Sequence, residues 1–205
     1  MKIYLLDVNE TIVDAWRRYF YPAFDDVAPV EFVQGDFASF MKTHEGHIDA
    51  VVSPANAYGL MDGGYDVALT EYFGNDLQLA VQKEIIKRFY GEQPVGTSFS
   101  IPIPDHSDML LIHTPTMRIP SKIKDPLIVY QCMRTTLMEA IYHNCNSIII
   151  PAFGALTGQV KLDVVAKMMY HGYSQIYNKE DRKEITRTKA ITQWISLNAA
   201  AGKIV

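Results

Sequence analysis

Short runs of apolar residues alternate along this chain with longer segments whose apolar residues recur every three or four positions. The short runs predict buried strands, and they lie at residues 3–6, 30–33, 49–52, 95–101, 109–113 and 148–150. The helical spacing predicts helices at residues 9–20, 67–73, 74–90, 124–143 and 161–173. This alternation predicts an α/β protein, namely a three-layer α/β/α sandwich with a mixed central sheet of about six strands.

The boundaries of the elements follow from a few residues. Pro102 should end the strand at 95–101, because proline lacks the backbone donor that a central ladder needs. Residues 179–201 are charged and then apolar at helical spacing, which predicts a C-terminal helical extension that packs on the body through Trp194. A chain of this length most simply holds one core, so residues 1–205 are predicted to form a single domain.

Composition narrows the setting in which the protein works. The net charge of -4 gives no general attraction to nucleic acid, and no apolar run reaches the roughly 20 residues of a membrane span. Met1-Lys2 leads into a strand without the apolar segment of a signal peptide, so we expect a cytoplasmic protein. Cys132 and Cys145 lack metal-ligand spacing. We therefore expect no metal and no cofactor, and the pattern leaves the oligomeric state open.

Two glycine-bearing loops each follow a predicted strand and precede a predicted helix. The first loop, after residues 49–52, reads SPANAYGLMDGGYD, and the second, after residues 148–150, reads PAFGALTG. In α/β sheets ligands bind beyond the carboxyl ends of the strands, and the bare N–H groups at a helix N-terminus attract anions. These two loops are therefore the candidate site.

The first loop resembles the signature loop of macro domains, the ADP-ribose-binding modules. It is most similar to a phage and bacterial branch with SPAN-type loops, and HTPTMRIP at residues 113–120 resembles a turn of the same branch. The resemblance implies that Asn56 orients the distal ribose and that Asp66, ten residues later, positions or deprotonates water for attack at the anomeric carbon. Taken alone, Asp66 is equally a helix N-cap.

The resemblance also implies a set of ligand-binding residues. Asp36 would accept a hydrogen bond from the adenine amino group and the N–H of Phe37 would reach the ring, although Asp36 is also placed as an ordinary helix N-cap. The second loop would cradle the diphosphate with backbone N–H groups. The implied set is Asp36, Phe37, Ser53, Ala55, Asn56, Tyr58, Gly63, Gly64, Tyr65, Asp66, Phe153, Gly154, Ala155, Leu156, Thr157 and Gly158.

Several positions depart from the pattern of that branch. Thr70 stands where many members have histidine, and Leu156 stands at the middle glycine of the second loop. If that position needs a positive φ, leucine costs about 1 to 2 kcal/mol there and places a side chain where a phosphate approaches. Either the loop has shifted in register or the ligand differs from ADP-ribose.

Three functions remain open at this point. The first is binding of ADP-ribose or a related ADP-ribosyl nucleotide, extended by hydrolysis of ADP-ribosyl linkages in a glycohydrolase or esterase reaction. The second is sequestration of such a nucleotide without turnover. The third is a phage-associated protein-interaction domain with a modified pocket, which would act in the host cytoplasm. Near the site, His113 is predicted to be a satisfied buried histidine, and Arg118 either binds phosphate or fixes a turn.

Overall fold

The computed structural model describes residues 1–20, 29–44, 46–178 and 184–203. Within these residues, six strands form one sheet in the order β2-β1-β6-β3-β5-β4. All neighbouring strands are parallel except β4 and β5, which are antiparallel. The strands are β1 (Lys2–Asp7), β2 (Val30–Gln34), β3 (Ala50–Ser53), β4 (Phe99–Ile103), β5 (His106–His113) and β6 (Ser147–Ile150). The predicted mixed sheet is confirmed.

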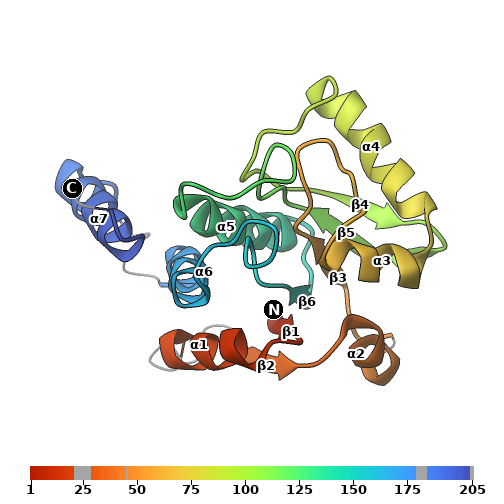
Figure 1. Ribbon diagram of the computed structural model, residues 1–205, viewed down its shortest axis with the longest axis horizontal. Coiled ribbons are helices and arrows are strands. Elements are labelled where there is room, and N and C mark those ends of the chain that lie inside the picture. Colours follow the sequence, from red (N-terminus) through yellow and green to blue (C-terminus); the bar gives the residue numbers. More distant parts are fainter. Residues whose placement is uncertain (21–28, 45, 179–183, 204–205) are drawn as a thin grey trace.

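Helices cover both faces of this sheet (Figure 1). One buried apolar cluster joins the sheet to α1 (Glu10–Phe20), α5 (Leu127–Tyr142) and α6 (Leu162–Tyr177). A second cluster joins the other face to α2 (Phe37–His44), α3 (Tyr65–Phe73) and α4 (Asp76–Phe89). The three-layer α/β/α architecture is therefore confirmed. Strands β3 and β6 are buried at every residue because both of their faces are covered, and each is apolar except for one serine.

Close contact between α5 and α6 depends on Gly172. A Cβ atom added to Gly172 would lie 2.8 Å from the Cβ of Met133 and 2.8 Å from the carbonyl oxygen of Tyr130. Because no side chain intervenes, the two helix backbones approach each other directly. This contact fixes α6, whose N-terminus follows the second candidate loop.

Strand β4 corrects one prediction. The strand at 95–101 was expected to end at Pro102, whereas β4 begins at Phe99 and runs through Pro102 to Ile103. The prediction was wrong because β4 is an edge strand, where the missing N–H faces away from the ladder. Pro102 is exposed, and the pairing with β5 shifts in register between Pro102 and Ile103.

The C-terminal helix α7 (Arg187–Ala200) corrects another prediction. Trp194 does not anchor this helix, because 57% of its surface is exposed. The buried residues at this end are Asn198 and Ala201, and Lys203 forms an ion pair with Asp125 at 2.6 Å. Residues 179–183 of the predicted extension lie outside the described residues. Among the described helices, none combines the length and apolarity that crossing a membrane requires.

Candidate functional site

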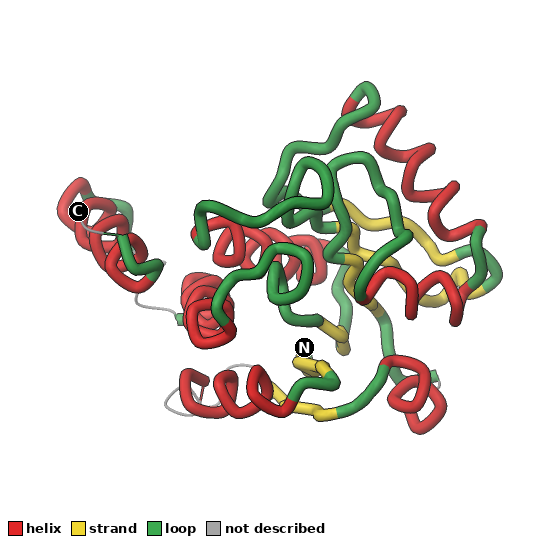
Figure 2. The backbone as a smooth tube through the Cα atoms, viewed as in Figure 1, coloured by secondary structure: helices red, strands yellow, loops and turns green. Residues whose placement is uncertain are grey.

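The site is built along the carboxyl ends of four neighbouring parallel strands. In the order of the sheet these are β2, β1, β6 and β3. The chain leaves them as loops, which Figure 2 shows in green. Asp36 follows β2, Asp7 ends β1, the second loop follows β6, and Ser53 ends β3. Both candidate loops therefore meet at one edge of the sheet, as the sequence predicted.

Asn56 holds the first loop together. Its Oδ1 accepts hydrogen bonds from the N–H of Tyr58 at 3.1 Å and of Leu60 at 3.3 Å, and its Nδ2 donates to the carbonyl of Leu60 at 3.0 Å. The loop packs against α4 at Gly59 (φ 66°), where an added Cβ would lie 2.8 Å from Ile85 Cδ1. The amide of Asn56 is thus engaged within its own loop, and it lines neither of the two cavities described below.

Asp66 lies in the first turn of α3, with its side chain buried. The N-cap of that helix is Gly64 (φ 60°), so Asp66 is not the cap that the sequence also allowed. The hydroxyl of Ser53 donates to Asp66 Oδ1 at 2.6 Å. The pKa of Asp66 is raised to about 7, mainly by burial. The hydrogen bond from Ser53 lowers the pKa, and the nearby charge of Asp62 raises it.

This raised pKa predicts a dependence of stability on pH. The folded chain binds the Asp66 proton more tightly than the unfolded chain, so the free energy of unfolding falls as pH rises from about 4 to about 7. The effect is on the order of 2 to 4 kcal/mol, since each pKa unit corresponds to about 1.4 kcal/mol. We expect Asp66→Asn, which cannot ionise, to be more stable than the parent protein at pH 8 and to lose that advantage near pH 4.

Urea unfolding of both proteins at pH 4, 6 and 8 measures this difference. Glu71→Gln removes an exposed carboxylate from the same helix, α3, and serves as the matched control. A stability difference between Asp66→Asn and the parent that stays constant across this pH range would contradict the prediction.

The second loop is shaped by two glycines. Gly154 has a φ of 72°, and a Cβ there would lie 2.7 Å from Ile123 Cδ1. A Cβ on Gly158 would lie 2.6 Å from the carbonyl oxygen of Gly154 and 2.6 Å from Ile123 Cδ1. Backbone hydrogen bonds fasten the turn, with the N–H of Ile123 donating to Gly158 at 2.9 Å and that of Val160 to Gly154 at 3.1 Å. The loop is therefore compact and tolerates no side chain at either glycine.

Leu156 does not adopt the positive φ that was considered for its position from the sequence. In the described chain the residues other than glycine with positive φ are Tyr90, Asp105, Asn144 and Gln159. Leu156 is 67% exposed, and its Cδ1 lies 3.6 Å from the position of a Cβ on Gly64. Leu156 thus reaches from the second loop to the first.

Two cavities lie on either side of this contact, and Leu156 lines both. The smaller cavity, of about 60 Å³, also contains Asp66, Gly63, Gly154, Thr157 and Gly158 in its lining. The larger, of about 430 Å³, is mostly apolar and is lined by residues that include Asp7, Asn9, Asp36, Phe37, Tyr65 and Ala155. The predicted site residues are therefore divided between two cavities that share Gly64, Tyr65, Ala152 and Leu156.

Asp36 has the N-cap role that the sequence allowed, and its recognition of adenine stays a prediction. Its Oδ1 accepts the N–H of Ser39 at 2.8 Å, which caps the start of α2 and lowers the pKa of the Asp36 carboxyl. The carboxylate is also exposed at the rim of the larger cavity. Phe37 is buried, with its ring packed edge-on against Tyr65 at 5.7 Å between centroids. Only the backbone of Phe37 can therefore serve a ligand.

Asp7, Val8 and Asn9 line the larger cavity and were not predicted. The half-buried carboxylate of Asp7 accepts the N–H of Asn9 at 2.8 Å, and burial raises its pKa. The available signal was a polar residue directly after the buried run at 3–6, the same pattern that marked the ends of β2 and β3. It was overlooked because no glycine follows it.

The remaining predicted residues lie outside the two cavities. The hydroxyl of Tyr58 donates to Glu92 at 3.1 Å, and Arg118 forms an ion pair with the same carboxylate at 2.6 Å, so Arg118 fixes a turn. Ala55 and Phe153 are buried. His113 is buried, as predicted, and its Nδ1 is bonded to Gln93 at 2.6 Å, but it is not fully satisfied, because its buried Nε2 has no hydrogen-bond partner among the described residues. Burial lowers the pKa of His113 to about 3, so its imidazole is neutral.

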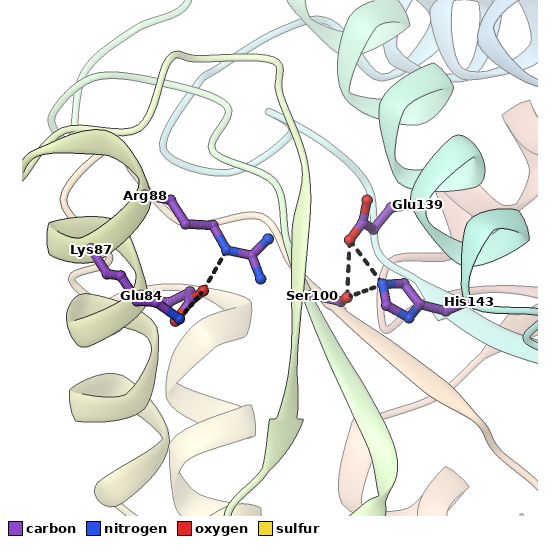
Figure 3. Close-up of polar contacts among 6 residues, drawn as sticks. All are labelled: Glu84, Lys87, Arg88, Ser100, Glu139 and His143. Atoms are coloured by element: carbon purple, nitrogen blue, oxygen red, sulfur yellow. Dashed lines mark hydrogen bonds and ion pairs between the residues drawn. The ribbon is translucent and has the colours of Figure 1, made fainter.

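A serine, a histidine and a glutamate also meet away from this edge (Figure 3). Ser100 Oγ lies 2.8 Å from His143 Nε2 and donates to Glu139 at 2.9 Å, which ties β4 to α5. The glutamate approaches the same ring nitrogen as the serine, at 3.3 Å. A catalytic triad needs the acid on the other nitrogen, so this cluster is structural. Among the described residues, no three His, Cys, Asp or Glu side chains gather as a metal site.

A three-layer sandwich with cavities and carboxylates along its strand ends defines an α/β protein built to hold a ligand at that edge. The Macro domain family model matches residues 52–169, and the chain belongs to this family. A protein of Aquifex aeolicus (strain VF5), described as uncharacterized, is 30% identical over 122 residues, which are 59% of this chain and 70% of that protein.

Solved structures support the fold. The macrodomain of Oceanobacillus iheyensis with ADP has a TM-score of 0.55 and 18% identity, covering 77% of this chain and 86% of that one. The macrodomain of Mycobacterium tuberculosis DarG has a TM-score of 0.55 and 18% identity, covering 65% of this chain and 86% of that one. At this level of identity the likeness establishes the architecture.

Proposed function

We propose that this protein binds ADP-ribose, or an ADP-ribosyl derivative, along the strand ends from Asp36 to Asp66. The observation that carries the proposal is the order of the features at that edge. A large apolar cavity with Asp36 at its rim is followed by a glycine-shaped loop and then by a buried carboxyl group in a small cavity. A base, a diphosphate and a distal ribose need these surroundings in this order.

The family supports this ligand. The Oceanobacillus iheyensis macrodomain is described with ADP, and a variant of it with ADPR. The net charge of -4 supports a small ligand over general nucleic-acid binding. The two cysteines, Cys132 and Cys145, are free and buried, which supports the cytoplasmic location expected from the sequence.

Hydrolysis of an ADP-ribosyl linkage is the extension of this proposal. Asp66 has a pKa near 7 and is held by Ser53, so it can accept a proton from water at the pH of the cytoplasm. Asp66 lines the smaller cavity, which in this proposal receives the distal ribose. The role given to Asn56 is less direct, because its amide already bonds to its own loop.

Binding without turnover is the second candidate, and Leu156 favours it. Leu156 lines both cavities at their shared boundary, and the cavity that contains Asp66 is small. A nucleotide held mainly in the larger cavity would be sequestered and left intact.

Titration calorimetry with ADP-ribose tests the proposal. We expect Asp36→Ala to weaken binding by about 1.5 to 3 kcal/mol, the contribution of a hydrogen bond to a charged group. Asp36 also caps α2, so Asp36→Ser is the matched control: it keeps an N-cap oxygen and removes the carboxylate. Equal losses in both variants support base recognition by Asp36. Full affinity in Asp36→Ser, or in both variants, would contradict it.

A further inference from the structure

Asp7 occupies a defined place between the base end and the diphosphate end of the site. Along the sheet, β1 lies between β2, which ends before Asp36, and β6, which ends before the second loop. A nucleotide with its base beside Asp36 and its diphosphate on residues 154–158 must therefore pass over the end of β1. The group of such a ligand that lies between base and diphosphate is its first ribose.

The carboxylate of Asp7 has the chemistry to hold that sugar. It lines the larger cavity, half-buried, and one of its oxygens accepts the N–H of Asn9. Within the described part of the chain, Asp7 has no ion-pair partner. A carboxylate can only accept hydrogen bonds, and two neighbouring hydroxyls of a ribose offer two donors to one carboxylate.

Tyr65 provides a second, independent indication that a ligand binds in the cavity lined by Asp7. Its ring lines both cavities, while its hydroxyl is buried and has no hydrogen-bond partner. Tyr65 lines the larger cavity together with Asp7 and the smaller one together with Asp66, and burial holds the pKa of its hydroxyl well above the ordinary value. A buried hydroxyl left unpaired is unfavourable, so a nearby donor or acceptor from a ligand would relieve it.

We propose that Asp7 accepts hydrogen bonds from the hydroxyls of the ribose next to the base, beside the Tyr65 hydroxyl, and so selects ribonucleotides over 2′-deoxyribonucleotides. This inference rests on the proposed function, because it takes the ligand to be an adenosine diphosphate derivative. Asp7 lies outside residues 52–169, the part of the chain that the family model matches. Asp7 is thus a specificity-determining residue of this chain.

The test compares ADP-ribose with its analogue that lacks the 2′-hydroxyl on the adenosine ribose. We expect the parent protein to bind ADP-ribose about tenfold to a hundredfold more tightly than the analogue, the range for a hydrogen bond to a charged group. Asp7→Asn should lose most of this preference by weakening ADP-ribose binding, with little change for the analogue. Tyr65→Phe should reduce the preference by a smaller factor.

The outcomes separate the two proposals. If the parent protein does not bind ADP-ribose, the proposed function fails and this inference fails with it. If the parent protein binds ADP-ribose and the analogue equally, only the role of Asp7 is overturned. This comparison uses the parent protein alone and needs no variant. An unchanged preference in a folded Asp7→Asn, checked by thermal unfolding, also overturns the role of Asp7. A preference lost in Asp7→Asn and kept in Asp108→Asn, an exposed acid on β5, supports it.

Discussion

Replacing Asp66 by asparagine is expected to lower hydrolysis of an ADP-ribosyl linkage by about a hundredfold to ten-thousandfold, the contribution of a general base. The carboxyl group is buried and has a pKa near 7, so a large fraction can accept a proton from water at neutral pH. Asparagine keeps an oxygen for the hydroxyl of Ser53 and cannot accept that proton. The loss should therefore appear in turnover while ADP-ribose binding changes little.

Release of ADP-ribose from a modified protein or a small ester measures this effect. In the parent protein the rate should rise with pH and level off above about 7, as Asp66 ionises. Asp62→Asn changes an exposed carboxylate of the same loop and should retain turnover. Equal rates in the Asp66→Asn variant and the parent would remove Asp66 from the mechanism. A parent protein that binds ADP-ribose without releasing any product from these substrates would favour sequestration.

Gly158→Ala is expected to reduce ADP-ribose affinity at least tenfold and to lower the free energy of unfolding by about 1 to 3 kcal/mol, the usual effect of overpacking. The added methyl group would meet the carbonyl oxygen of Gly154 at 2.6 Å, a backbone atom of the same loop that cannot turn aside. The turn must open, and its N–H groups would then no longer converge on a phosphate.

Calorimetry and urea unfolding of the Gly158→Ala variant provide the two measurements. Gly63→Ala is the control for unfolding, because nothing lies within 4 Å of its added Cβ and its φ is not positive. If Gly158→Ala were as stable as the parent and bound ADP-ribose as tightly, the second loop would not be the diphosphate site.

Most of the fold could be predicted because a strand that is buried on both faces appears in the sequence as a short run of apolar residues. Strands β3 and β6 each contain three consecutive buried apolar residues, a signal that is present in the local sequence whatever their neighbours are. The errors arose where the outcome depends on a distant element. The local sequence does not show that Pro102 lies at the edge of the sheet, because that place is set by the pairing of β4 with β5. The spacing of Trp194 likewise does not show that α7 packs through Asn198.

The candidate site could be predicted in part for a similar reason. Loop glycines after a strand are local signals, and they led to the two loops, whereas the resemblance to macro domains led to Asp36 and Asp66. The approach of Leu156 to Gly64 joins residues far apart in the sequence, so only the fold reveals it. The buried environment that raises the pKa of Asp66 is likewise a property of the packed structure.

The outer edge of β4 bears on how copies of this protein behave at high concentration. An open edge strand is a template on which another chain can add a strand, which is a route to aggregation. Here Pro102 removes one donor from that edge, and the shift in register beside it interrupts the even spacing of the others. On this side the sheet is therefore protected against growth by strand addition, which leaves β2 as the edge strand open to it.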